Sequence, residues 1–69
     1  MTPKQSRAIG RNVRIIRGHG YTDTSVGVST CARGDERGVI VAAMSHEVTI
    51  RLDTDRVVLA AWHAVEVTD

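Results

Sequence analysis

The second half of the chain alternates between apolar and polar residues in the manner of a half-buried β-strand. In residues 47–52 the apolar side chains Val48, Ile50 and Leu52 fall on one face, because successive side chains of a strand point to opposite sides. The β-branched run of residues 56–59 follows after the short polar segment 53–55. Two such runs joined by three residues predict a β-hairpin.

Further elements are predicted on both sides of this hairpin. Residues 38–43 form a continuous apolar run of strand length, in which we expect Val41 to be as buried as Ile50. Residues 60–64 are too few for a stable helix and suit one 3₁₀ turn, and residues 65–67 alternate again. The pattern therefore predicts a three-stranded meander, a 3₁₀ turn and a short last strand.

The beginning of the chain allows two interpretations. Val13 and Ile15 alternate with their polar neighbours as a first strand would, but Ile9 and Val13 also have the spacing of one helical face. We expect a short helical turn over residues 3–9, followed by a strand over residues 11–17. Helix and strand both remain open for this segment.

The length of 69 residues indicates one small domain, which buries only about 60% of the surface that its unfolded chain exposes. We divide it into a basic N-terminal arm, residues 1–10, and a body, residues 11–69. Residues 18–37 are rich in Gly, Thr, Ser and Asp and predict a long loop with at most one short hairpin. Cys31 is the only cysteine, so an internal disulfide is excluded, and we expect it to be a small, partly buried filler.

This order of strand, long loop, meander, 3₁₀ turn and last strand resembles the SH3-like small barrel. The segments that carry the resemblance are residues 13–17, 18–37, 38–41, 48–52, 56–59, 60–64 and 65–67. In the KOW-type members a glycine opens the second strand, as Gly38 would here. The resemblance implies an all-β fold, a small five-stranded SH3-like barrel with a short basic N-terminal segment. The aromatic groove of signalling SH3 domains is missing, because Tyr21 and Trp62 are the only aromatic residues.

A second similarity concerns residues 8–17, which are similar to the first helix of phage-repressor helix-turn-helix domains. Such a domain needs further helices after this segment. Residues 24–30 are instead rich in Ser, Thr, Val and Gly, which form helices poorly. We therefore favour the barrel.

The charges are unevenly distributed along the chain. The first twenty residues carry a charge of +5, whereas from residue 21 onward four arginines face eight carboxylates. This asymmetry is typical of a basic arm on an acidic body. We expect partner contacts from Lys4, Arg7, Arg11, Arg14, Arg17 and Trp62. The hypothesis is a non-catalytic assembly or adaptor module that docks on a protein partner or on itself through this Arg-rich segment. The alternative is a KOW-like nucleic-acid-binding protein that uses the same arginines.

Catalytic and metal chemistry have little support in the sequence. His19, His46 and His63 are too far apart to share a face through local spacing, and we expect them in turns and on the surface. The pair Asp53 and Asp55 lacks the glycine and the distal glutamate of a calcium loop. We therefore expect no enzyme, no cofactor, no metal and no small-molecule substrate.

The location predicted from the sequence is cytoplasmic or particle-associated. No apolar stretch at the beginning of the sequence has the features of a signal peptide. The longest apolar runs, residues 39–44 and 57–62, are far shorter than the roughly 20 residues that span a bilayer, so no membrane role is expected. The preference for arginine over lysine indicates a GC-rich bacterial or phage genome.

Overall fold

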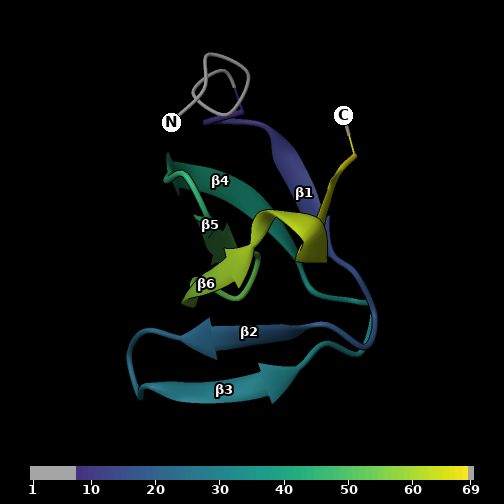
Figure 1. Ribbon diagram of the computed structural model, residues 1–69, viewed down its shortest axis with the longest axis vertical. Coiled ribbons are helices and arrows are strands. Elements are labelled where there is room, and N and C mark those ends of the chain that lie inside the picture. The colour runs from purple at the N-terminus through teal and green to yellow at the C-terminus, as the bar shows by residue number, and fades with distance from the viewer. Residues whose placement is uncertain (1–7, 69) are drawn as a thin grey trace.

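The computed structural model describes residues 8–68, which fold into antiparallel β-strands and one 3₁₀ turn (Figure 1). The elements are β1 (Asn12–Ile15), β2 (Gly20–Asp23), β3 (Val28–Cys31), β4 (Arg37–Ala43), β5 (Glu47–Leu52), β6 (Val57–Ala61), η1 (Trp62–Ala64) and β7 (Val65–Val67). The described residues form no α-helix, and the predicted all-β class is confirmed. They include no helix long and apolar enough to cross a membrane.

The strands form one sheet in the order β3-β2-β6-β5-β4-β1-β7. It bends strongly, and the molecule measures 29 × 22 × 21 Å. Figure 1 shows the β2–β3 hairpin lying across the end of the meander, away from β1 and β7. The two outermost strands do not pair with each other, so this sheet is not closed. Among residues 8–68 there are seven strands where five were expected, because the long loop contributes the pair β2 and β3.

The core lies on the concave face of the sheet, as the alternating pattern predicts. Strand β5 buries Val48, Ile50 and Leu52 and exposes Arg51. The side chains that are almost completely shielded from solvent are Val13, Ile15, Ile40, Val48, Ile50 and Val58. They come from four neighbouring strands, β1, β4, β5 and β6, so the free energy of apolar burial is concentrated in this part of the sheet.

The exposure of Val41 contradicts the prediction for the apolar run of residues 38–43. Val41 was expected in the core, but 43% of its surface is exposed. The register between β4 and β5 shifts between Ile40 and Ala42, which leaves Val41 as the extra residue of a β-bulge. A bulge interrupts the alternation of side chains, and the uniform apolar run gave no sign of it.

The other expected elements agree with the structure to different degrees. The polar turn between β5 and β6 and the last strand lie where the pattern places them. The 3₁₀ turn begins at Trp62 and not at residue 60, because β6 continues to Ala61. The first strand is shorter than residues 11–17, and its strand conformation rules out the helix-turn-helix interpretation. Most of the helical turn expected over residues 3–9 lies outside the described residues, and residues 8–10 form a turn in which the N–H of Arg11 donates to the carbonyl of Ala8.

Candidate binding surface on the outer face of the sheet

Three arginines from adjacent strands lie on the convex, outer face of the sheet. These are Arg14 of β1, Arg37 of β4 and Arg51 of β5. Each of them comes directly before or after a buried residue of its strand. Since side chains alternate along a strand, all three point away from the core. We call Arg14, Arg37 and Arg51 the outer arginine cluster.

The strand register brings these arginines close together. Arg14 and Arg37 are direct partners in the β1–β4 pair, and Arg51 is the partner of Val39, two residues along β4 from Arg37. Direct cross-strand neighbours lie about 5 Å apart and diagonal ones about 7–8 Å apart. The three guanidinium groups can therefore contact one anionic surface at the same time.

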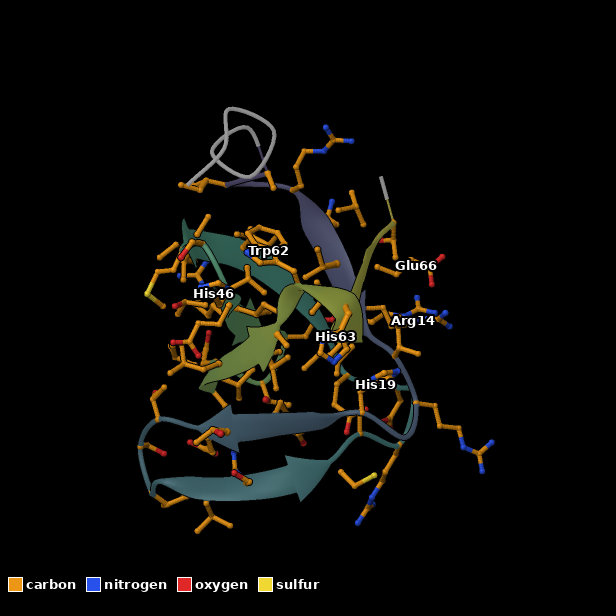
Figure 2. The ribbon with its side chains drawn as sticks, viewed as in Figure 1. Arg14, His19, His46, Trp62, His63 and Glu66 are labelled. Atoms are coloured by element: carbon orange, nitrogen blue, oxygen red, sulfur yellow. The ribbon has the colours of Figure 1, made fainter. Side chains whose placement is uncertain are left out.

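Among residues 8–68, Arg14 is the only arginine of the cluster that forms an ion pair. Arg14 faces Glu66 of β7 and forms an ion pair with it at 2.8 Å between Nη2 and Oε2 (Figure 2). The buried Nε of Arg14 has no hydrogen-bond partner among residues 8–68. Within residues 8–68, neither Arg37 nor Arg51 forms an ion pair with a carboxylate. Like charges placed opposite each other across two strands destabilise a sheet, so this arrangement does not serve stability.

The residues predicted to contact a partner are only partly brought together. Lys4 and Arg7 lie outside the described residues. Arg11 is exposed just before β1, and Arg17 is exposed in the loop after it, alongside Gly34. The third described arginine of that set is Arg14. It lies next to Arg37 of β4 and forms a cluster with Arg37 and Arg51.

Arg37 and Arg51 were missed by the sequence analysis. The alternation in β5 already places Arg51 on the face opposite Ile50. The pattern of a single strand does not show which strands are neighbours, so it could not join Arg37 and Arg51 to Arg14. The register of the sheet supplies this information.

The side chain of Trp62 contacts the core and the turn between β4 and β5. Its side chain is partly buried against the core, and its Nε1–H donates a 2.6 Å hydrogen bond to the carbonyl oxygen of Met44 in the turn between β4 and β5. This contact ties η1 to the meander. The predicted role of Trp62 in partner binding stays a prediction.

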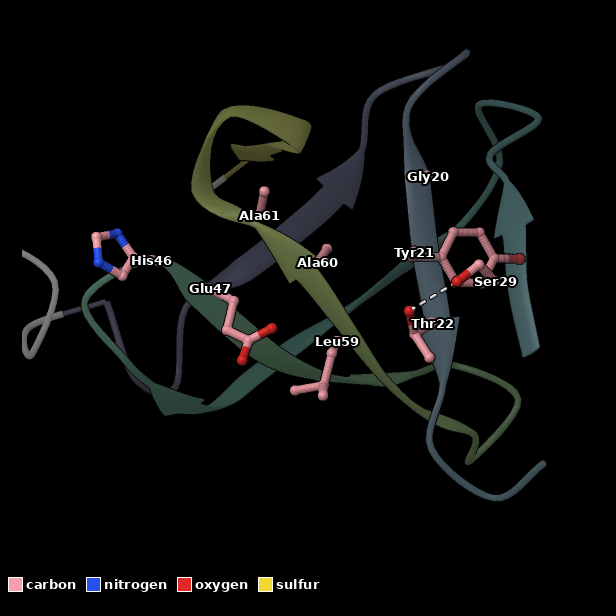
Figure 3. A pocket seen from close by; sticks show the side chains of 9 residues that line it. All are labelled: Gly20, Tyr21, Thr22, Ser29, His46, Glu47, Leu59, Ala60 and Ala61. Carbon is pink, nitrogen blue, oxygen red and sulfur yellow. Dashed lines mark hydrogen bonds between the residues drawn. The ribbon is translucent and has the colours of Figure 1, made fainter. Parts of the chain in front are cut away.

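A shallow groove of about 510 Å³ lies between the hairpin and the meander (Figure 3). Its lining residues are Gly20, Tyr21, Thr22, Ser29, His46, Glu47, Leu59, Ala60 and Ala61. The hydroxyl groups of Thr22 and Ser29 are hydrogen-bonded to each other at 3.1 Å, and His46 and Glu47 lie at the opposite end.

Nowhere in residues 8–68 do three or more His, Cys, Asp or Glu side chains gather as they would around a metal ion.

Two carboxylates anchor the hairpin at its ends. At the tip, the side chain of Asp23 accepts hydrogen bonds from the N–H of Ser25 at 3.0 Å and its hydroxyl at 2.7 Å, and it pairs with Arg56 at 3.1 Å. The hydrogen bonds from Ser25, followed by the charge of Arg56, lower the pKa of Asp23 although burial opposes them.

At the base of the hairpin, Glu36 accepts hydrogen bonds from the backbone N–H groups of Arg33 and Gly34, each at 3.0 Å. The hydroxyl of Tyr21 also donates to it, at 3.3 Å. Burial raises the pKa of Glu36, but the backbone N–H donors outweigh burial and leave the pKa below its usual value. Burial and the neighbouring Glu36 raise the pKa of Tyr21.

Two further predictions concern single side chains. Cys31 was expected to be partly buried, but it is exposed, because β3 is an edge strand whose four residues all face solvent. His46 and His63 are exposed as expected, and His19 is partly buried. The rings of His19 and His63 lie next to each other although 44 positions separate them in the sequence.

The chain was compared with protein-family models, curated proteins and solved structures, and none of them matches it.

Proposed function

We propose that this protein is a non-catalytic binding module that docks on an acidic surface of a protein partner. The outer arginine cluster would make the central contacts, and the Arg-rich N-terminal segment, including Arg11 and Arg17, would extend them. The observation that carries the proposal is the convergence of Arg14, Arg37 and Arg51 on one face, two of them without a carboxylate partner among residues 8–68.

Arginine suits this role because its planar guanidinium group donates two parallel hydrogen bonds to a carboxylate. The composition favours a protein over single-stranded nucleic acid, since binding of unpaired bases relies on aromatic stacking. Tyr21 and Trp62 are the only aromatic side chains, and both have hydrogen bonds within the fold. Charge complementarity of this kind gives specificity and a fast association rate more than high affinity.

For the fold, we propose an open variant of the SH3-like small barrel. The support is the order of elements and the pairing of β1 with both β4 and the last strand, β7. In this proposal the hairpin of β2 and β3 occupies the long first loop and pairs with β6.

A KOW-like nucleic-acid-binding function is the second candidate. The guanidinium groups of Arg37 and Arg51, which form no ion pair with a carboxylate of residues 8–68, favour it. Each arginine that neutralises a phosphate releases a counterion. In that case the affinity would fall steeply with salt for duplex or single-stranded DNA or RNA.

The experiment is a fluorescence anisotropy titration with a glutamate-rich peptide, mixed-sequence DNA and mixed-sequence RNA at about 50 and 200 mM salt. The proposal expects binding to the acidic peptide at low salt and weaker binding to both nucleic acids. The double variant Arg37→Gln/Arg51→Gln should lose about tenfold in peptide affinity, which corresponds to about 1.4 kcal/mol. Arg33→Gln is the matched control, because it removes an exposed arginine outside the outer arginine cluster.

A further variant tests Arg14 through its partner. Glu66→Gln breaks the 2.8 Å ion pair and frees the Arg14 guanidinium group, so it should raise the affinity for the peptide. Tighter binding to DNA or RNA than to the peptide would favour the second candidate. Equal losses in the double variant and in Arg33→Gln would contradict both.

A further inference from the structure

His19 and His63 come from separate parts of the fold and meet at the surface. His19 lies in the loop between β1 and β2, and His63 lies in η1 (Figure 2). Their ring centroids are 5.5 Å apart, with the ring planes inclined at 66°. The order of residues does not indicate this contact, because only the tertiary fold brings His19 and His63 together.

Backbone hydrogen bonds hold the loop that carries His19 beside η1. The N–H of His19 donates to the carbonyl of Ile16 at 3.1 Å, and the carbonyl of His19 accepts from the N–H of Ala32 at 2.7 Å. The N–H of Ile16 donates to the carbonyl of Ala64 at 2.7 Å, which joins this loop to η1. These bonds hold the backbone of the β1–β2 loop beside η1, and at that junction the rings of His19 and His63 meet.

The ring separation fits two imidazoles on one metal ion. Zn²⁺ binds imidazole nitrogen at about 2.0–2.1 Å in tetrahedral geometry, which places the centroids of two bound rings roughly 5 Å apart. Within the described residues, neither imidazole takes part in a side-chain hydrogen bond that would occupy its nitrogens.

We propose that His19 and His63 form a two-histidine site for a divalent transition-metal ion that prefers imidazole ligands, Zn²⁺ or Cu²⁺. No third His, Cys, Asp or Glu among residues 8–68 completes a ligand set, so water fills the remaining coordination positions. The bound ion links the β1–β2 loop to η1 and stabilises the folded state, because the unfolded chain does not hold the two rings together.

The test is a titration of the whole protein with Zn²⁺ and with Cu²⁺, followed by calorimetry and by thermal unfolding. The expected result is one ion per chain and a melting temperature that rises with the metal and returns to its starting value with a chelator. His19→Gln and His63→Gln should each weaken binding at least tenfold and abolish the rise. His46→Gln is the matched control and should behave as the unmodified protein, because His46 lies in the turn between β4 and β5, apart from this pair.

Unfolding of each variant without metal, followed by circular dichroism, shows whether the substitutions leave the fold intact. If a glutamine variant does not fold, the NMR signals of the imidazole rings in the unmodified protein replace it. Metal should then perturb the rings of His19 and His63 and not that of His46. No binding, binding that all three variants retain, or perturbation of His46 alone would overturn the proposal.

Discussion

The meander of β4, β5 and β6 and the hairpin of β2 and β3 are stabilised by different interactions. Strand β5 buries three apolar side chains, whereas β3 buries none and β2 buries only the carboxylate of Asp23. The hairpin is attached by its pairing with β6, by the ion pair of Asp23 with Arg56 at its tip and by the hydrogen bond that Tyr21 donates to Glu36 at its base. One region of this sheet is thus held by apolar burial and the other mainly by polar contacts.

This difference has a consequence for where binding can occur. The meander and β1 form a well-packed support, and the outer arginine cluster lies on that support and not on the hairpin. A binding site on a well-packed strand keeps the spacing of its side chains, which favours recognition of a defined anionic surface.

The largest effect is expected from a cavity in the meander. Ile50→Ala removes a completely buried side chain and should cost about 2–5 kcal/mol of unfolding free energy. Chemical denaturation followed by circular dichroism measures it. Val41→Ala is the control within the same meander. Because Val41 is 43% exposed, it should cost less than about 1 kcal/mol. Equal losses would contradict the position of the bulge.

An alanine substitution at one glycine of each region tests how closely the strands pack there. A Cβ atom at Gly38 in β4 would overlap the backbone of Arg51 and Leu52, so Gly38→Ala should cost about 1–3 kcal/mol or more. At Gly20 in β2 the nearest atom, the carbonyl oxygen of Thr30, would be 3.9 Å away, which is ordinary contact. Gly20→Ala should therefore be close to neutral in thermal unfolding. A tolerated alanine at position 38 would show that β4 and β5 are not paired in this register.

The polar anchoring of the hairpin should depend on pH. Folding lowers the pKa values of Asp23 and Glu36 from unfolded values of about 3.8 and 4.5. The stabilisation is present above those unfolded values and is lost as the pH falls through the lower folded values. The urea midpoint should therefore be higher at about pH 6 than at about pH 3. Asp23→Asn should reduce this difference, and an unchanged pH dependence in that variant would argue against the Asp23 contacts.

The smallest effect is expected on the outer strand of the hairpin. Val28 in β3 is 55% exposed, so Val28→Thr should change the unfolding free energy by no more than about 0.5 kcal/mol. Thermal unfolding of the variant checks this value. A loss similar to that of Ile50→Ala would mean that β3 is covered in solution.

The alternating pattern predicted the meander because a strand with one buried face has apolar residues at every second position. The alternation of Val48 and Ile50, the turn that follows β5 and the last strand were correctly predicted from it. The hairpin has a weaker sequence pattern, because all four residues of β3 are exposed to solvent. The position of β3 depends on its backbone pairing with β2. The bulge at Val41 is invisible in a uniformly apolar run.

The candidate sites depend on contacts between distant parts of the chain. Arg14 was predicted to contact a partner, but its grouping with Arg37 follows from the register of β1 and β4. The meeting of His19 and His63 likewise follows from the packing of a loop against η1. A single sequence records which residues are exposed more clearly than it records which of them are neighbours.

The most direct test of the binding surface is an NMR titration of the isotope-labelled protein with the glutamate-rich peptide at low salt. The backbone amides of β1, β4 and β5 around Arg14, Arg37 and Arg51 should show the largest chemical-shift changes, and those of β3 should stay in place. Shifts confined to the β2–β3 hairpin, or no shifts at saturating peptide, would contradict docking through the outer arginine cluster.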